Sequence, residues 1–387
     1  MALAVAILAS GCRLGFDLLP GGGASDDGGP EVDADPLAVD AAPIDAVPPD
    51  AAPDAAPATA TESQSGVTVP ESASDLISID PVLLTESFVT CSRRSTASTL
   101  DLNLARCQLL DGSSLRIESA AKDSSAVTSW TVLQVPGAVV QRGTETFATN
   151  DLTRDITITS VDPARTFALV STSSPLAAVD NDERGSTMIQ LVSDTTVRLT
   201  RGSIGAAATI DFQIIQFPST SVQSGVVNMG IADLTKSDAL APTVDLSRTF
   251  VVHSTSIGSD VDGAEAVYMT ASGLSATDVT FSRKVSGEPL QVSWFAVELP
   301  VTSTVKTQQV QSVVPHDQLV FEFSDNNYTE GMISFSSLEI DSGILRTSLN
   351  AASFTSVISA GKVSLERNVS DGSQIRLRTT VVDIVMP

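Results

Sequence analysis

The sequence predicts an all-β protein: a tandem array of four small antiparallel β-sandwich repeats that follows a disordered linker. Three observations lead to this fold class. Ser, Thr, Val, Ala and Asp are abundant and aromatic residues make up only 4% of the chain, a composition that suits many short strands better than helices. Similar stretches of chain recur at intervals of about 80 residues. Apolar and polar side chains alternate within them, as at Val292, Trp294 and Ala296, so one face of each strand should be buried.

The N-terminal sequence predicts where in the cell the protein is located. Ala2 to Leu8 form an apolar run too short to span a bilayer, and Ala9-Ser10-Gly11-Cys12 resembles the lipobox of bacterial lipoproteins. That resemblance implies removal of a signal peptide, residues 1–11, and acylation of Cys12, which would attach the protein to a membrane. Two features depart from the pattern: Leu8 stands one place early and no Lys or Arg precedes the run. The alternative is a truncated ordinary signal peptide followed by an incidental free Cys.

Residues 12–62 have the composition of a disordered linker, which would connect the predicted lipid anchor to the folded part. From Gly21 to Thr61 the chain consists largely of Gly, Asp, Ala and Pro, which leave little surface to bury and repel one another through like charges. Some forty residues of this kind could extend over roughly 100 Å. We therefore expect a disordered spacer that displays the folded part away from the cell envelope. Arg13 directly after the Cys suggests the outer membrane.

The repeats are clearest where each copy ends. The segments 130–136, 212–218 and 294–300 match position for position, and each ends in proline. Successive prolines lie 82 residues apart (218 − 136 and 300 − 218), and Pro387 ends a degenerate fourth copy 87 residues later (387 − 300). Because proline cannot donate to a ladder, each should end its last strand. The predicted repeats are 63–137, 138–218, 219–300 and 301–387.

Other residues recur at matching positions in the copies. An aromatic residue recurs in each closing segment, as Trp130, Phe212 and Trp294, and we interpret these three as core anchors, with a platform that stacks on sugars as the alternative. Gln followed two residues later by Gly recurs near the start of three copies. In the third copy we expect six strands, near residues 222–228, 242–246, 249–255, 264–271, 278–285 and 290–299.

The repeat length, the strand count and the closing segment Val292 to Val297 resemble the H-type lectin fold, a six-stranded sandwich that usually works as a sugar-binding trimer. The resemblance covers one repeat at a time and implies carbohydrate binding. No loop matches that family's sugar site, so no binding residue is carried over.

Composition and motifs argue against two functional classes. The net charge of -24 disfavours a nucleic-acid partner. The two histidines, His253 and His316, lie in different copies, and the chain has no Gly-x-Ser-x-Gly elbow, so we predict that the protein is not an enzyme. We expect His253 to be a half-buried strand residue.

Two candidate sites remain. Cys91 and Cys107 lie in the first copy on strands that should be neighbours, and an exported setting favours a disulfide worth about 3 kcal/mol. Acidic turns between third and fourth strands are calcium candidates, with a plain solvated turn as the alternative. Apart from calcium, no cofactor is expected. The calcium candidates are Asp180 and Asp182 in the second copy and Asp260 and Asp262 in the third.

The sequence supports two hypotheses of function. The first is a surface-displayed, lipid-anchored binding or adhesion protein that recognises glycans or a surface protein through loops of the sandwiches. The second is a structural cell-envelope protein whose β repeats pack on themselves and bind no small molecule.

Overall fold

The protein is all-β, as predicted. The chain divides into two compact units, Met1–Pro53 and Asp54–Pro387, and every described residue belongs to the second. The predicted signal peptide, Cys12 and almost the whole predicted linker lie outside the described residues. The computed structural model describes residues 61–95, 104–173, 186–205, 207–258, 269–284, 286–312, 318–322, 332–340, 355–359, 362–366 and 375–384.

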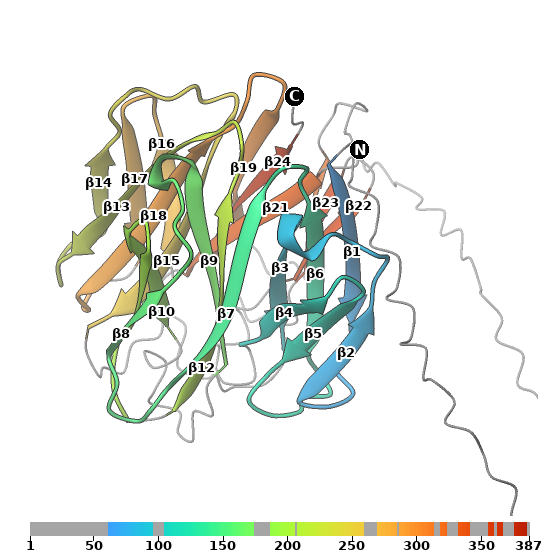
Figure 1. The fold of residues 1–387 in the computed structure, drawn as a ribbon. Coiled ribbons are helices and arrows are strands. Elements are labelled where there is room, and N and C mark those ends of the chain that lie inside the picture. Colours follow the sequence, from blue (N-terminus) through green and yellow to red (C-terminus); the bar gives the residue numbers. More distant parts are fainter. Residues whose placement is uncertain are drawn as a thin grey trace, which may run out of the picture. The chain divides into compact units, whose positions relative to one another are not determined.

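The described strands form eight three-stranded antiparallel sheets with one recurring order (Figure 1). In chain order they fall into four sets of six strands. In each set the first, sixth and third strands form one sheet, here called the long sheet, and the second, fifth and fourth form another, the short sheet.

The strands of the four sets have the following bounds. Set 1 contains β1 Glu62–Thr68, β2 Ser74–Ser78, β3 Ser87–Arg94, β4 Arg106–Asp111, β5 Ser114–Glu118 and β6 Val127–Gln134, with the short 3-10 helix η1 Leu84–Glu86. Set 2 contains β7 Val139–Phe147, β8 Thr153–Thr157, β9 Thr166–Ser173, β10 Thr187–Ser193, β11 Thr196–Arg201 and β12 Ala208–Gln216, with η2 Pro163–Arg165. Set 3 contains β13 Ser221–Met229, β14 Thr235–Ala239, β15 Thr249–Ile257, β16 Met269–Leu274, β17 Asp278–Arg283 and β18 Leu290–Glu298. Set 4 contains β19 Thr304–Ser312, β20 Gln318–Glu322, β21 Met332–Ile340, β22 Thr355–Ser359, β23 Lys362–Glu366 and β24 Ile375–Asp383.

The strand ends agree with the proline prediction in the first three sets. β6, β12 and β18 each stop two residues before the recurring proline, which cannot supply the next ladder hydrogen bond. Burial alternates in β17, where Val279 and Phe281 are fully buried while Thr280 between them is partly exposed. The prediction that only one face of a strand is buried was wrong for β18, in which every residue from Val292 to Val297 is buried. One face of β18 packs in the core of its own set and the other in the cluster that joins the sets.

One predicted strand of the third copy was misplaced. The second strand is β14, Thr235–Ala239, whereas residues 242–246 belong to the connection between β14 and β15. There Asp245 accepts a hydrogen bond from the backbone N–H of Ser247 at 3.0 Å. β14 has no large apolar side chain, so the hydrophobic pattern did not reveal it. The fourth strand is described over Met269–Leu274, and residues 264–268 of the predicted strand lie outside the described residues.

The predicted core anchors are core residues. Trp130, Phe212 and Trp294 are 9%, 5% and 2% exposed, which rules them out as exposed sugar platforms. In set 1, Trp130 packs in one cluster with Cys107 and Leu115 of the short sheet. The two sheets of this set therefore share a core, and set 3 has the same arrangement around Trp294.

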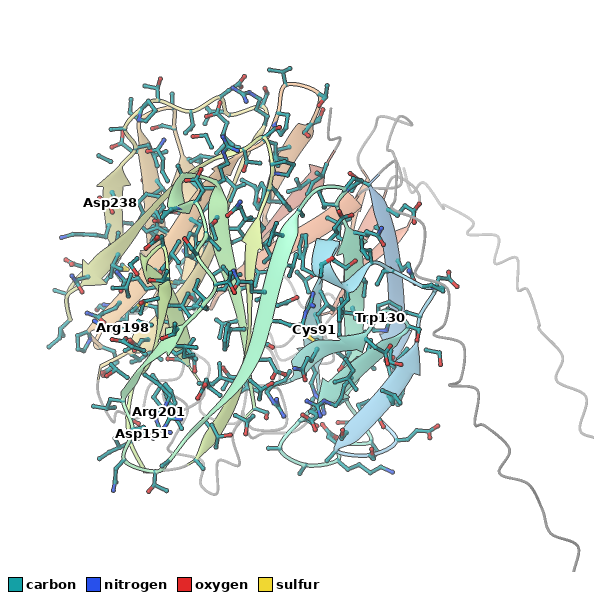
Figure 2. The ribbon with its side chains drawn as sticks, viewed as in Figure 1. Cys91, Trp130, Asp151, Arg198, Arg201 and Asp238 are labelled. Carbon is teal, nitrogen blue, oxygen red and sulfur yellow. A yellow bond between two sulfur atoms is a disulfide. The ribbon has the colours of Figure 1, made fainter. Side chains whose placement is uncertain are left out.

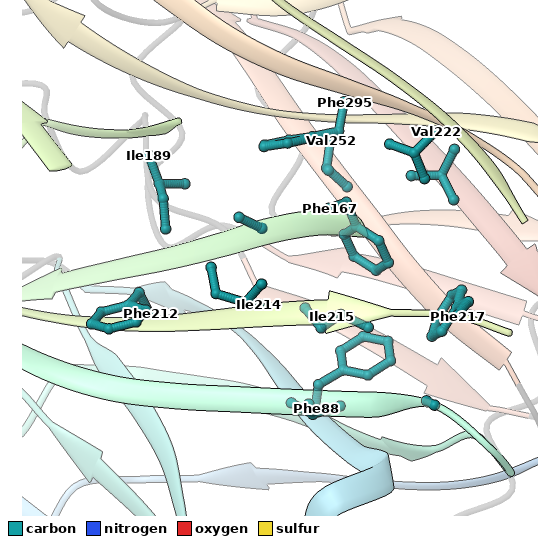
Figure 3. Close-up of a cluster of buried hydrophobic side chains, with 14 of the residues drawn as sticks. Phe88, Phe167, Ile189, Phe212, Ile214, Ile215, Phe217, Val222, Val252 and Phe295 are labelled. Atoms are coloured by element: carbon teal, nitrogen blue, oxygen red, sulfur yellow. The ribbon is translucent and has the colours of Figure 1, made fainter. Parts of the chain in front are cut away.

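A larger cluster joins the sets to one another (Figure 3). The second residue of the third strand is Phe88 in set 1, Phe167 in set 2 and Phe250 in set 3. The ring of Phe167 lies 6.1 Å from that of Phe88 and 6.0 Å from that of Phe250, both edge to face. Val305 and Val382 of set 4 belong to the same cluster, so the long sheets of all four sets contribute to one shared core.

Contacts between neighbouring sets follow one rule. The fourth strand of each set lies against the long sheet of the next: β4 against β9 and β12, β10 against β15 and β18, and β16 against β21 and β24. The last set obeys the same rule towards the first, because β22 lies against β6, β3 and β1. The contacts therefore close a ring.

The recurring glycines are explained by the aromatic residues opposite them. Gly66 pairs with Trp130 and Gly143 with Phe212 across the sheet. A Cβ atom on Gly66 would lie 2.5 Å from the Trp130 ring, and one on Gly143 would lie 2.5 Å from the Phe212 ring. Each large ring thus occupies the space that a side chain on the paired strand would need.

In each of the first three sets, the recurring glutamine forms hydrogen bonds with the backbone of the segment that follows the second strand. Gln141 accepts a hydrogen bond from the backbone N–H of Thr159 and donates one to its carbonyl, both at 2.8 Å. Gln64 does the same with Asp80, and Gln223 bonds Ala241 and Pro242. The side-chain amide therefore replaces a strand partner for backbone that would otherwise lack one.

Candidate functional site

A cavity of about 380 Å³ lies where sets 1, 2 and 3 meet. Its walls come mainly from the third strands β3, β9 and β15, and the residues just before β4 and at the start of β10 complete them. Hydroxyl side chains are frequent on these walls. They are Ser92, Ser171, Thr172, Thr187, Ser254 and Thr255.

Three of these hydroxyls occupy one repeated position. Ser92, Ser171 and Ser254 are each the sixth residue of their third strand, and Ser337 holds the same place in β21. The residue just before each of the first three is paired with the recurring aromatic residue of its set. The register of the sheets thus brings equivalent serines from three copies to one cavity.

Two of these serines also join neighbouring sets. The backbone N–H of Ile189 in β10 donates to Oγ of Ser254 at 3.0 Å, and that of Cys107 in β4 approaches Oγ of Ser171 at 3.5 Å. Both donors are equivalent, because Cys107 pairs with Ile117 and Ile189 with Leu199 in their short sheets. In each case the fourth strand of one set meets the third strand of the next.

Thr187 has a different role at the cavity wall. Its side chain is 6% exposed, and its hydroxyl finds no hydrogen-bond partner among the described residues. A buried hydroxyl without a partner costs free energy. A molecule in the cavity that offered a polar atom to Thr187 would remove that cost.

Two basic side chains occur among the described residues that line the cavity. Arg93 and His253 line the cavity, while no Asp or Glu occurs among the described residues that line it. Arg93 is 6% exposed. Burial lowers the pKa of Arg93, and the attraction of Asp123 and Asp75, which acts in the opposite direction, does not offset it.

His253 lies in β15 and is half-buried, as predicted. Its ring centroid is 5.7 Å from that of Phe281 in an edge-to-face contact. It occupies the position that Cys91 and Val170 hold in sets 1 and 2, opposite the recurring aromatic residue.

A buried ion pair lies directly beside the cavity. Arg106 follows the lining residue Ala105, and its guanidinium bonds Asp211 of set 2 and Ser173, both at 2.9 Å, and also Glu118. The side chains of Arg106 and Asp211 are 8% and 5% exposed. The pair therefore ties β4 of set 1 to β12 of set 2 with little contact with water. The sequence did not lead us to predict this ion pair. Asp211, the one acidic residue in the apolar strand 208–216, could have indicated a buried partner.

The predicted disulfide is confirmed. Cys91 and Cys107 are bonded, with their Cα atoms 6.3 Å apart, and Figure 2 labels Cys91. The two strands were expected to be neighbours, but Cys91 lies in the long sheet and Cys107 in the short sheet. The bond therefore fastens the two sheets of set 1 to each other, and Cys91 also lines the cavity.

The remaining predicted site residues lie outside the described residues. These are Cys12 and the calcium candidates Asp180, Asp182, Asp260 and Asp262, so the lipid anchor and the calcium site stay predictions. Within the described ranges, no group of three or more His, Cys, Asp or Glu side chains could hold a metal ion. In that part of the chain, no helix is long and apolar enough to cross a bilayer.

Comparison with known proteins gives no family. No protein-family description matches the sequence, and no curated protein resembles it significantly. What the protein does must therefore be argued from the cavity and its surroundings.

Proposed function

We propose that the protein is a lipid-anchored binding or adhesion protein of the bacterial cell envelope, which recognises glycans in the cavity between its first three strand sets. In this proposal each set is one small β-sandwich, the four sandwiches span residues 63–137, 138–218, 219–300 and 301–387, and Cys12 carries the lipid at the outer membrane.

The recurring strand order supports the four-sandwich arrangement. All four sets share the same two sheet orders, and sets 1 and 3 each bury a cluster that draws on both of their sheets. Two sheets that bury one apolar face between them constitute a sandwich. The resemblance to the six-stranded H-type lectin sandwich points the same way.

The observation that carries the glycan proposal is the hydroxyl-lined cavity. Ligand sites are usually concave, pre-formed and about 300–1,000 Å³ in volume, and this cavity falls within that range. A hydroxyl both donates and accepts, as do the hydroxyls of a sugar. Thr187, buried at the wall without a partner, is the group most in need of such a ligand.

Glycan-array binding by a soluble full chain, with Cys12→Ser to prevent acylation, tests the proposal. We expect reproducible sugar hits that weaken at least tenfold in Thr187→Val, which removes the cavity hydroxyl at nearly constant volume. Thr235→Val, on the exposed strand β14, is the matched control and should bind normally. An array without hits, or equal loss in both variants, would contradict the proposal.

Lipidation needs a separate test. Cells that express the chain should incorporate labelled palmitate into it, and Cys12→Ala should abolish the label. A wild-type protein that takes up no label would show that this part of the proposal is wrong.

The second candidate is a structural envelope protein without a small-molecule ligand. It is favoured by the contacts between sets, above all the buried Arg106–Asp211 pair, which show that sets already pack on one another within a chain. Sedimentation that reveals concentration-dependent assembly, together with a silent glycan array, would select this alternative.

A further inference from the structure

We infer that a ligand in the cavity is held by the backbone of sheet edges, and that it is a pyranose with two adjacent free hydroxyl groups. The inference rests on the proposed glycan function and adds to it the part of the sugar that is recognised. It follows from the direction in which the backbone groups of the third strands point.

The third strand lies at the edge of each long sheet. In an antiparallel strand, the backbone groups of alternate residues point towards the partner strand, and those of the residues between them point away. The carbonyl of Arg165 points towards the partner, because it accepts a hydrogen bond from the N–H of Phe217, the residue after β12. Counted from Arg165 in steps of two, the outward residues of β9 are Ala168, Val170 and Thr172.

The same rule applies in sets 1 and 3, where the carbonyls of Glu86 and Arg248 accept the equivalent hydrogen bonds. Two consecutive outward positions of each third strand line the cavity, and they are equivalent in the three sets. These residues are Cys91 and Arg93 in β3, Val170 and Thr172 in β9, and His253 and Thr255 in β15. Three sheet edges therefore border the cavity.

Val89 shows what an outward edge residue binds. Its N–H donates to Oε1 of Gln213 at 2.9 Å, and its carbonyl accepts from Nε2 of the same side chain at 2.7 Å. One accepting group and one donating group, side by side, thus complete this edge position. Val89 corresponds to Ala168 in β9, and the next outward residues along β9 are Val170 and Thr172.

Within the described part of the chain, no side chain completes Val170 or Thr172 in this way. Thr172 is 7% exposed, and a buried backbone group without a partner costs free energy. A ligand that accepts from an outward N–H and donates to the neighbouring C=O would remove that cost.

Two adjacent hydroxyl groups of a pyranose offer the same pair of functions as the Gln213 carboxamide. One hydroxyl can accept from the N–H while its neighbour donates to the C=O. The hydroxyls of Ser171, Ser254 and Thr187 border the same space and can bind the remaining groups of the ring. A volume of about 380 Å³ is near the lower end of the range for ligand pockets, which suits one or two sugar rings.

Nuclear magnetic resonance of the amide groups tests the inference on the soluble full chain (Cys12→Ser). The probes are the methyl glycosides of glucose, galactose and mannose. At least one should bind and shift the amide protons of Val170 and Thr172 downfield. The amide protons of Leu169 and Ser171, which point towards β12, are the internal control and should move much less.

Deoxy sugars test the need for adjacent hydroxyls. The 3-deoxy form of the bound glycoside has no two adjacent hydroxyls left and should bind at least tenfold more weakly. The 6-deoxy form keeps the adjacent hydroxyls and is the matched control, with an affinity close to that of the parent glycoside.

A proline substitution removes the backbone donor itself. Val170→Pro deletes the outward N–H, and proline is tolerated in edge strands where the N–H faces away from the ladder, so this variant should bind the glycoside at least tenfold more weakly. Val251→Pro is the matched control, because Val251 is an outward residue of β15 outside the lining residues, and it should bind like wild type. If Val170→Pro unfolds, the amide shifts of the unaltered strand decide.

The outcomes separate the inference from the proposed function. Sugar binding that leaves the amide protons of Val170 and Thr172 unmoved, or equal affinity for the parent and 3-deoxy glycosides, would overturn the inference and leave the glycan function standing. Hits on the glycan array without binding of any of the three glycosides would do the same. Absence of all sugar binding would reject both.

Discussion

The indole N–H of Trp294 donates a hydrogen bond to the carboxylate of Asp238 at 3.1 Å. Set 1 has a tryptophan at the same place but no such partner. Ile77 stands where set 3 has Asp238, and Nε1 of Trp130 is buried without a hydrogen-bond partner among the described residues. Set 2 avoids the problem, because Phe212 has no N–H to satisfy.

This difference predicts unequal effects of one substitution. Trp294→Phe should destabilise the protein by about 1–3 kcal/mol more than Trp130→Phe, because it removes the partner of a carboxylate while the other change removes an unsatisfied donor. Phe212 shows that a phenyl ring is accepted at this position. Urea unfolding followed by circular dichroism measures both variants, and equal free energies of unfolding would show that the Asp238 bond contributes nothing.

A methyl group opposite the recurring aromatic residue should be costly. Gly143→Ala places Cβ 2.5 Å from the Phe212 ring, so the ring or the strand must move, at a cost of about 1–3 kcal/mol. Gly258→Ala is the control, since its nearest neighbour would be 3.6 Å away. Thermal unfolding should separate the two variants. Similar melting temperatures would mean that the aromatic ring moves aside freely.

Reduction of the Cys91–Cys107 bond should lower stability without abolishing the fold. The bond closes a chain segment with a sequence separation of 16, and loop-closure entropy assigns it about 3 kcal/mol. Urea unfolding with and without reductant measures the effect, with the double variant Cys91→Ser/Cys107→Ser as the control that should no longer respond. Two free thiols in the native protein would contradict the structure.

The buried ion pair between sets 1 and 2 should show strong coupling. Arg106→Met leaves Asp211 buried near Thr144 without its cation, and breaking such a pair typically costs about 3–5 kcal/mol. Asp211→Ser copies the serine found at this position in sets 1 and 3. We expect the double variant to lose clearly less stability than the sum of the single variants. Additive losses would show that the two side chains do not interact.

The sequence predicted the all-β class, the closing strands and the disulfide because these depend on patterns within one copy. β18 contains a tryptophan and ends before a proline, and both features can be read within one copy. β14 was missed since Thr235–Ala239 lies on the surface and carries no apolar signal. The cavity could not be predicted, because its walls combine Arg93, Thr187 and Ser254 from three copies. Serine is too common in exposed strands for its recurrence to indicate a shared site.

The return of β22 to the first set has a consequence for how such a protein can evolve. An open solenoid gains or loses a unit with little penalty, provided that its ends are capped by polar surfaces. Here the short sheet of set 4 covers the long sheet of set 1. Duplication or deletion of one unit would disrupt the contacts between sets 4 and 1, so a change in the number of units should cost more stability here than in an open solenoid.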